Sequence, residues 1–275
     1  MPKLLPDDSH LRNLAAALGL AYLLPLGQNP YASVFKARSR GGKAVAVKCM
    51  TLDEGEDAEA HSKKNRRAQK ERDMAHWAAD QGLGPPILKH VMLPLASCLV
   101  MPCAEVDLQV FWRRQARASS LAVTRTLWRD AFDLVSAPQL CEGCWIGADL
   151  KPANFLLYRM SSGYQICLND FDACFWRRAS SSQVASLINT IVLLSNALFL
   201  LPLPLLVPHL PDAIIDVLHR LLSEDPSLLA VLKDNMPWLR RGLLHYSRAS
   251  NLEQHLMLLR QRATAHGHML GFALR

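Results

Sequence analysis

The feature that most constrains the fold is a long uncharged run, from Gln183 to Pro208 (QVASLINTIVLLSNALFLLPLPLLVP). A run of this length could cross a bilayer as a helix. However, Asn189, Ser195 and Asn196 interrupt it, and three prolines break its last third, so a helix would end near Leu201. These interruptions favour a buried helix at the centre of a helical domain, with a membrane span as the alternative.

The first hundred residues have a different pattern, which is typical of strands. Residues 21–50 indicate a hairpin of two or three strands with a Gly41-Gly42 turn, and residues 87–102 indicate two further strands around a turn near Pro94. Between them, residues 53–81 are rich in charge and indicate a helix, which the sequence GLGPP then ends.

Beyond Asp107 most of the chain is predicted to be helical. Helices are expected over residues 108–118, 122–136, 182–201, 213–224 and 252–266, with a short strand-loop-strand over residues 145–168. The predicted fold class is α+β, with a small β-rich N-terminal lobe that contains one main helix and a mostly helical C-terminal lobe. The expected divisions are a helical extension at 1–20, a first lobe at 21–103 and a second lobe at 104–275.

Composition narrows the partners and the compartment. The net charge of +7 suits phosphorylated ligands or acidic partners, but it is spread along the chain and does not indicate nucleic acid. Seven cysteines, mostly inside apolar runs, are typical of buried thiols in a reducing compartment, so a cytoplasmic protein is predicted. The Cys141–Cys144 pair lacks the second pair of a zinc site. The N-terminus lacks the basic start of a signal peptide, and a short amphipathic helix beginning near Asp8 or Ser9 is expected.

Three short motifs carry the chemistry, and they follow one another in a fixed order. VAVK ends at Lys48, DLKPAN runs from Asp149 to Asn154, and NDFD contains Asp170. Phosphoryl transfer needs positioned phosphates, neutralised charge and an oriented nucleophile. In this order the motifs resemble the signature set of the eukaryotic-type protein kinases and their kinase-like relatives. The resemblance implies a bilobal kinase-like fold that uses ATP and Mg²⁺ to phosphorylate a protein hydroxyl, most closely as a serine/threonine kinase.

The resemblance assigns nucleotide contacts to the first lobe. The sequence LGQNPYASV resembles the glycine-rich loop, in which Gly27 is retained, Asn29 and Ala32 replace the other two glycines, and Val34 follows. Lys48 corresponds to the lysine that contacts the α- and β-phosphates.

A glutamate of the following helix pairs with this lysine in the family. Glu71 is favoured for this role, with Glu59 as the alternative, because Met74 and Ala75 provide an apolar face beside Glu71. The segment LVMPCA resembles the hinge that binds adenine. Met101 would be the gatekeeper, Pro102 would offer its carbonyl and Ala104 its N–H.

The second lobe would supply the reacting groups. By resemblance, Asp149 orients or deprotonates the acceptor hydroxyl, and Lys151 neutralises the γ-phosphate. Asn154 and Asp170 would hold Mg²⁺, and Phe171 would pack beneath the helix that carries the glutamate.

The departures from the family pattern concern regulation. Gly147-Ala148 replaces the usual His-Arg, whose arginine grips a phosphate on the activation loop. Only about ten residues separate Asp172 from Gln183, so a normal activation segment cannot fit. Gln183 would occupy the place of an aspartate of the family's central helix. The arginine and its loop are missing together while the reacting residues remain, which favours an active enzyme without activation-loop control.

Two other functions stay open. Small-molecule kinases of the aminoglycoside and choline kinase type keep the Asp, Asn and Asp set and also lack a peptide platform. A nucleotide-binding pseudokinase would explain the depleted glycine loop. The expected partners are ATP and an unidentified protein substrate of a monomeric enzyme, without nucleic acid or membrane. A compact kinase of this kind is also compatible with delivery into a host cell.

Overall fold

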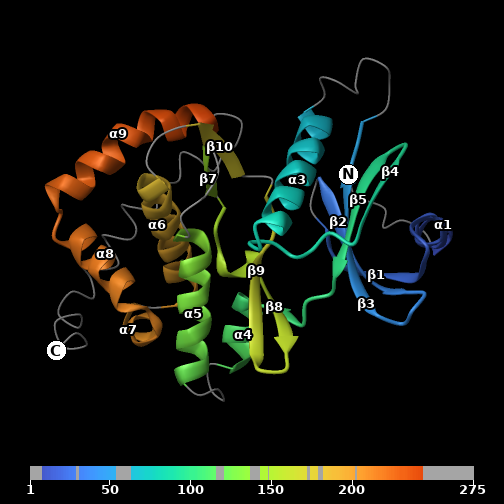
Figure 1. Ribbon diagram of the computed structural model, residues 1–275, viewed down its shortest axis with the longest axis horizontal. Coiled ribbons are helices and arrows are strands. Elements are labelled where there is room, and N and C mark those ends of the chain that lie inside the picture. Colours follow the sequence, from blue (N-terminus) through green and yellow to red (C-terminus); the bar gives the residue numbers. More distant parts are fainter. Residues whose placement is uncertain are drawn as a thin grey trace. The chain divides into compact units, whose positions relative to one another are not determined.

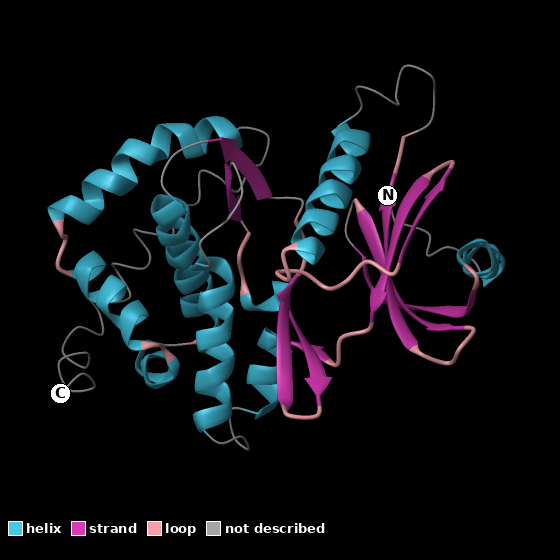
Figure 2. Cartoon of the chain, viewed as in Figure 1, coloured by secondary structure: helices cyan, strands magenta, loops and turns pink. Residues whose placement is uncertain are grey.

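The computed structural model describes residues 8–28, 31–53, 63–115, 121–136, 143–147, 149–171, 174–178, 182–201 and 203–243. The chain divides into two compact units. Unit 1 contains Met1–Glu105 and Cys167–Asp172, and unit 2 contains Val106–Ile166 and Ala173–Arg275. Figure 2 shows that the described part of unit 1 is mainly strands and that of unit 2 mainly helices. The fold class is therefore α+β, with an antiparallel sheet in the N-terminal part, as predicted.

Unit 1 is built on a five-stranded antiparallel sheet in the order β1-β2-β3-β5-β4 (Figure 1). The strands are β1 (Leu20–Gln28), β2 (Ala32–Ser39), β3 (Ala44–Thr51), β4 (Lys89–Leu93) and β5 (Ala96–Pro102). Side chains alternate between the two faces along each strand. Val47 and Cys49 of β3 point into an apolar core shared with helix α1 (Asp8–Leu18), whereas Lys48 points to the opposite face, toward helix α3 (Lys63–Asp80).

Unit 2 contains two small sheets and most of the helices. β6 (Val106–Asp107), β8 (Phe155–Met160) and β9 (Gly163–Leu168) form one sheet, although the last two residues of β9 are counted in unit 1. β7 (Gly143–Gly147) pairs with β10 (Cys174–Arg178). The helical elements are α4 (Leu108–Gln115), α5 (Leu121–Ser136), η1 (Pro152–Asn154), α6 (Ser182–Leu200), α7 (Leu203–Leu206), η2 (Val207–His209), α8 (Asp212–Leu222) and α9 (Pro226–Leu243).

Helix α6 is the uncharged run, and it lies in the core of unit 2. Ile188, Ile191 and Leu193 are at most 1% exposed, and polar Asn189 is equally buried. The prediction of a buried core helix is therefore confirmed. Among the helices described, none is both long and apolar enough to cross a membrane.

Several predicted boundaries are wrong. Asp53 is not helical, because its side chain and backbone bind the first turn of α3, and the described helix begins at Lys63. The region around residues 145–168 holds three strands rather than two, and the short strand β10 was not predicted.

Helix α9 was also not predicted. Its N-cap is regular, because Asp225 accepts hydrogen bonds from the N–H groups of Ser227 and Leu228, and Pro226 begins the helix. The expected helix at 252–266 lies outside the described residues.

Candidate functional site

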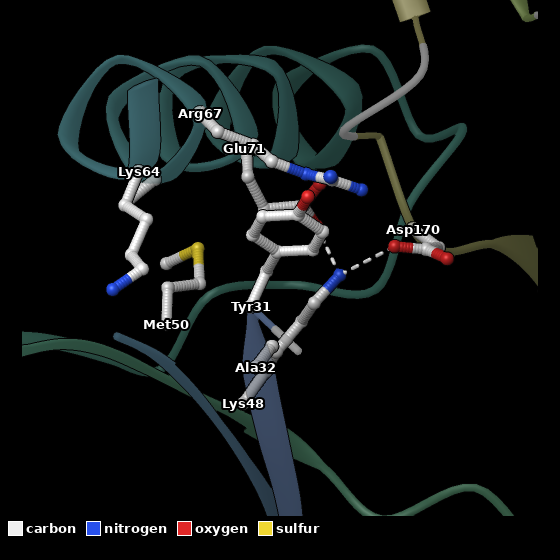
Figure 3. A pocket seen from close by; sticks show the side chains of 9 residues that line it. Tyr31, Ala32, Lys48, Met50, Lys64, Arg67, Glu71 and Asp170 are labelled. Atoms are coloured by element: carbon white, nitrogen blue, oxygen red, sulfur yellow. Dashed lines mark hydrogen bonds and ion pairs between the residues drawn. The ribbon is translucent and has the colours of Figure 1, made fainter. Parts of the chain in front are cut away.

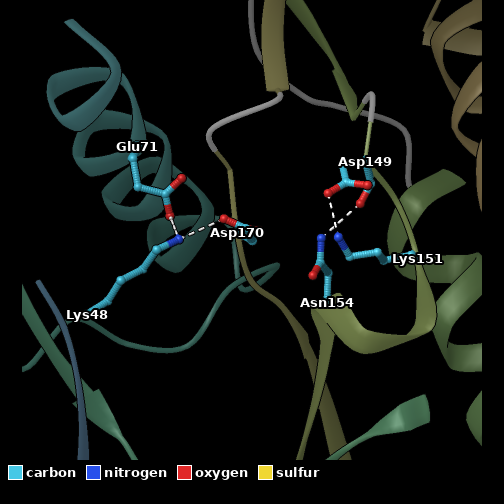
Figure 4. Close-up of polar contacts among 6 residues, drawn as sticks. All are labelled: Lys48, Glu71, Asp149, Lys151, Asn154 and Asp170. Carbon is cyan, nitrogen blue, oxygen red and sulfur yellow. Dashed lines mark hydrogen bonds and ion pairs between the residues drawn. The ribbon is translucent and has the colours of Figure 1, made fainter. Parts of the chain in front are cut away.

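Lys48 is the centre of a buried charge cluster in unit 1. It is only 6% exposed, and its Nζ lies 2.5 Å from Glu71 Oε1 and 2.9 Å from Asp170 Oδ1 (Figure 4). The three residues come from β3, from α3 and from the segment after β9, so the fold brings together positions far apart in sequence. Glu71 is the glutamate that the sequence favoured for this pair, and Glu59 lies outside the described residues.

Lys48 stabilises the charge of each carboxylate, whereas the charge of Asp170 raises the pKa of Glu71. Burial alone would lower the pKa of Lys48, but the carboxylates of Glu71 and Asp170 outweigh it and the pKa is raised. Burial raises the pKa of Glu71, while the Lys48 charge opposes that rise. Lys48 is therefore a fixed ammonium group at neutral pH. A buried ion pair of this kind is costly to break, because the remaining charge would lose its partner.

Asp170 has an uncommon backbone conformation. Its φ is +68°, a left-handed region that non-glycine residues seldom adopt and that aspartate tolerates better than most. The following Phe171 is 1% exposed. A Cβ added to Gly84 would lie 3.4 Å from the Phe171 ring and 3.1 Å from Ala78 Cβ of α3, so Phe171 is buried at the end of that helix. Conformations of this type are enriched at functional sites, where surrounding packing holds them.

An apolar surface lies next to Lys48 on the same face of the sheet. Partners across an antiparallel ladder share a face, and the register pairs Lys48 with Val34 on one side and with Leu99 on the other. Ala46 is likewise paired with Met101. Val34, Lys48 and Met101, which are predicted nucleotide residues of β2, β3 and β5, therefore lie in one continuous strip on the same face.

The predicted hinge follows directly after this strip. Pro102 ends β5, and the Cys103 N–H donates to the Ala44 carbonyl at 3.3 Å. Among the described residues, the Ala104 N–H donates to no acceptor. In β1, a Cβ on Gly27 would meet nothing within 4 Å, so packing within the described chain does not require glycine there. Ala32 is buried, and Asn29 lies outside the described residues.

A second polar cluster lies in unit 2, in the loop between β7 and β8. Lys151 Nζ donates to Asp149 Oδ2 at 2.6 Å, and Asn154 Nδ2 donates to the Asp149 carbonyl at 2.8 Å (Figure 4). Pro152 begins the 3₁₀ turn η1, and the Asn154 N–H closes it on the Lys151 carbonyl. The loop is thus folded on itself by contacts among its three predicted functional residues.

The polar residues of α6 anchor this loop. Asn189 Oδ1 accepts the Gly147 N–H at 3.0 Å, and its Nδ2 donates to the carbonyls of Trp145 and Val135 at 3.3 and 3.2 Å. Farther along the same helix, Asn196 Nδ2 donates to the carbonyl of Leu150. These two asparagines bind the backbone on both sides of Asp149, so they satisfy polar groups that would otherwise be buried without partners.

Sequence reasoning gave Gln183 the place of an aspartate of the family's central helix, but the loop is bound by Asn189 and Asn196. Gln183 is exposed at the first turn of α6, whereas Asn189 lies almost two turns later and is 1% exposed. Sequence reasoning had treated Asn189 only as an interruption of an apolar run. The position of Asn189 within an otherwise apolar run could have indicated an anchoring role, because a buried amide needs hydrogen-bond partners.

Packing explains the glycine at position 147. A Cβ there would lie 2.6 Å from Leu150 Cγ and 2.9 Å from the Trp145 ring, closer than side-chain atoms can approach. Trp145 is 1% exposed and fills the volume in which a larger residue would stand. Gly147 is therefore matched to its neighbours and could not be replaced by histidine without repacking. Ala148 lies outside the described residues.

The chain has little length between Asp170 and α6. Strand β10 pairs antiparallel with β7 over Cys174–Gly147 to Arg178–Gly143, and α6 begins at Ser182. Five of the eleven residues that link Asp170 to Ser182 therefore pair with the strand that leads into the Asp149 loop. Asp172 lies outside the described residues.

Two predicted side chains have the chemistry for a hard metal ion. The Asn154 amide directs its nitrogen to the Asp149 carbonyl, which leaves the oxygen for a ligand, and Asp170 offers a carboxylate that is one quarter exposed. Oxygen donors of this kind suit Mg²⁺. Within the described ranges, no group of three or more His, Cys, Asp or Glu side chains could hold a metal ion.

The sequence matches no protein-family model, and no curated protein matches it either. The resemblance to protein kinases therefore rests on the motifs and on the contacts described above.

Proposed function

We propose that this protein is an ATP-dependent phosphotransferase that resembles a serine/threonine protein kinase, with a bilobal kinase-like fold. The enzyme would transfer the γ-phosphoryl group of Mg-ATP to a hydroxyl group of a protein, without control by an activation segment. The observation that carries the proposal is the buried Lys48, bonded at once to Glu71 and Asp170.

This cluster is difficult to explain as a stabilising feature alone. Burying Lys48 and Glu71 costs desolvation energy that apolar residues of similar size would not incur. The cluster also stands beside an apolar strip that leads to the Ala104 N–H, which is the combination expected for a planar base joined to phosphates. Strongly perturbed charges beside an apolar surface are typical of functional sites.

Each cluster would have a separate task. Lys48 would contact phosphate oxygens, and Glu71 would hold the ammonium group in position for them. Asp149 would accept the proton of the acceptor hydroxyl as its oxygen bonds to the γ-phosphorus and the bond to ADP breaks. Lys151 would balance the charge that develops on the transferred group. The reaction requires both clusters to act on one nucleotide.

Asn154 and Asp170 would hold Mg²⁺ through oxygen atoms, in keeping with their chemistry. When bound, the ion would supply charge neutralisation for the phosphates. The chain's own contribution is to keep both side chains oriented, through the Asp149 carbonyl for Asn154 and through Lys48 for Asp170.

A small-molecule kinase is the second candidate, and the β10–β7 pairing favours it. Protein kinases lay a peptide across a long segment after the metal-binding motif, and here β10 and the early start of α6 leave no length for one. A small alcohol would not need such a platform. Lys151 in the DLKPAN motif argues for the protein kinase, because that lysine is typical of the serine/threonine enzymes.

The acceptor class can be measured directly. The purified chain would be incubated with γ-labelled ATP, Mg²⁺, a mixture of basic and acidic proteins, and a mixture of aminoglycosides and amino alcohols. Acid precipitation separates labelled protein from labelled small molecules. We expect label in the precipitate. Label only in the supernatant, dependent on an added alcohol, would transfer the proposal to the small-molecule kinases.

A pseudokinase gives a third result. Mg-ATP would raise the melting temperature, but neither fraction would be labelled above the level of a boiled sample. That outcome would overturn the proposed reaction and leave nucleotide binding.

A further inference from the structure

The N-terminal half of α3, which carries Glu71, has almost no apolar surface. Its sequence is KKNRRAQKE, and Ala68 is its only buried apolar residue among those described, whereas Met74, Ala75 and Ala78 anchor the second half. Its first turn has no acidic residue, and the lysine and arginine side chains there are repelled by the positive end of the helix dipole. Apolar burial therefore cannot fix this half of the helix, and other contacts must place Glu71.

One such contact is a stacked pair between the helix and Tyr31, the residue that precedes β2. The Arg67 guanidinium lies over the Tyr31 ring, 3.8 Å from the ring centroid (Figure 3). Arg67 precedes Glu71 by four residues, so both point to the same side of α3. Tyr31 is in turn tied to the end of β3, because the Thr51 N–H donates to the Tyr31 carbonyl at 2.9 Å.

A second contact holds the first turn of α3 to the end of β3. Lys64 Nζ donates to Asp53 Oδ1 at 2.5 Å, and the Asp53 N–H donates to Asn65 Oδ1 at 2.8 Å. The Lys64 and Asp53 side chains are 41% and 34% exposed, so this ion pair contributes little by itself. The Arg67–Tyr31 stack lies between it and Glu71, beside the small pocket that Lys48 and Ala68 also line.

We propose that Tyr31 and Arg67 are positioning residues, which clamp α3 so that Glu71 holds Lys48 in place for phosphate. By packing, the stack would hold the helix that carries the glutamate in position, as a phosphorylated activation loop does in regulated kinases. In this respect the inference rests on the proposed function. The contact itself joins two residues of unit 1, so it can be tested without nucleotide.

The test compares Tyr31→Leu, which removes the ring, with Tyr31→Phe, which keeps it. Arg67→Gln removes the cation and keeps most of the side-chain stem. Exposed Tyr22→Leu and Arg66→Gln serve as matched controls on β1 and α3. The first readout is the rate at which acetic anhydride acetylates Lys48, measured by peptide mass spectrometry without nucleotide. The second is hydrogen exchange of the 63–80 segment.

Tyr31→Leu and Arg67→Gln should each raise both rates about tenfold, which corresponds to about 1.4 kcal/mol of lost clamping. Tyr31→Phe and the two controls should remain within about twofold of wild type. The double variant should be no worse than either single variant, since each removes the same contact. If Tyr31→Leu fails to fold, Arg67→Gln provides the comparison, because it leaves the Tyr31 ring in place.

Unchanged Lys48 acetylation and unchanged exchange in Arg67→Gln would overturn the inference. The KM for ATP separates this failure from failure of the proposed function. If Tyr31→Leu turns over ATP with the same KM as the wild type, the proposed function stands and the proposed clamp is refuted. If the protein never binds ATP, yet Lys48 becomes more reactive in both variants, the clamp stands and the proposed function is refuted.

Discussion

Replacing Asn189 by leucine should be among the most damaging single changes in unit 2. The side chain is 1% exposed and makes three hydrogen bonds, to the Gly147 N–H and to the carbonyls of Trp145 and Val135. Leucine has a similar volume, so the change removes polar contacts and creates no large cavity. Each orphaned buried backbone group costs about 1–3 kcal/mol. Partial relaxation should reduce the sum to about 3–5 kcal/mol, a large part of the stability of an ordinary domain.

Urea unfolding followed by tryptophan fluorescence measures this loss, because Trp145 lies beside the broken contacts. Gln183→Leu is the matched control on the same helix, and its exposed side chain should leave stability within about 0.5 kcal/mol. A loss below about 1 kcal/mol for Asn189→Leu, or equal losses at the two positions, would refute the assignment of Asn189 as the anchor of the Asp149 loop.

Other changes test other parts of the account. Gly147→Ala should lower stability by about 1–3 kcal/mol through overpacking, whereas Gly41→Ala, whose Cβ would meet nothing closer than 3.9 Å, should change the melting temperature little. Burial lowers the pKa of His209, so as the pH falls the unfolded chain takes up this proton before the folded chain does. The free energy of unfolding should therefore fall as the pH drops below about 6.5. His209→Gln should weaken this pH dependence in urea titrations at several pH values. Lys48→Met should cost about 3–5 kcal/mol because two carboxylates lose their cation, and adding Glu71→Leu should recover part of the loss in the same unfolding assay, while an unchanged or larger loss would contradict the ion-pair reasoning.

The parts of the site that the sequence predicted are those in which residue type and order are both restrictive. Neither a lysine in an apolar strand nor the DLKPAN loop is distinctive alone, and it was their order with NDFD that indicated the site. The resemblance pairs Lys48 with a glutamate, and the apolar face beside Glu71 selected this residue, which the structure places in contact with Lys48. The strands of unit 1 were visible from their alternation. In these cases local pattern and tertiary contact point to the same arrangement.

The parts that the sequence did not predict depend on contacts between distant segments. The resemblance placed Gln183 where the family has an aspartate, but the rotation of a helix that is apolar on all sides cannot be read from periodicity. Only the packed structure shows that Asn189 faces the loop. Strand β10 is five residues long and is formed by pairing with β7, so it has no strong pattern of its own.

The same dependence explains Gly147, one of the departures from the kinase pattern. The inferred loss of regulation rested on the arginine that Ala148 replaces, and the sequence offered no reason for a glycine at position 147. In the structure this glycine is a packing requirement, set by Trp145 and Leu150. Restoring the histidine of the family would therefore damage this loop rather than repair it.

The central claim is that Lys48 and Asp149 belong to one phosphotransferase. The most direct measurement is the single-turnover transfer of label from γ-labelled ATP to any acceptor, for the wild type, Asp149→Asn and Lys48→Met. Exposed Asp133→Asn and Lys43→Met are the matched controls. We expect transfer by the wild type and both controls, and a loss of at least about 10²-fold in each of the other two variants. Transfer that survives in Asp149→Asn and Lys48→Met, or that is absent from the wild type with every acceptor, would contradict this claim.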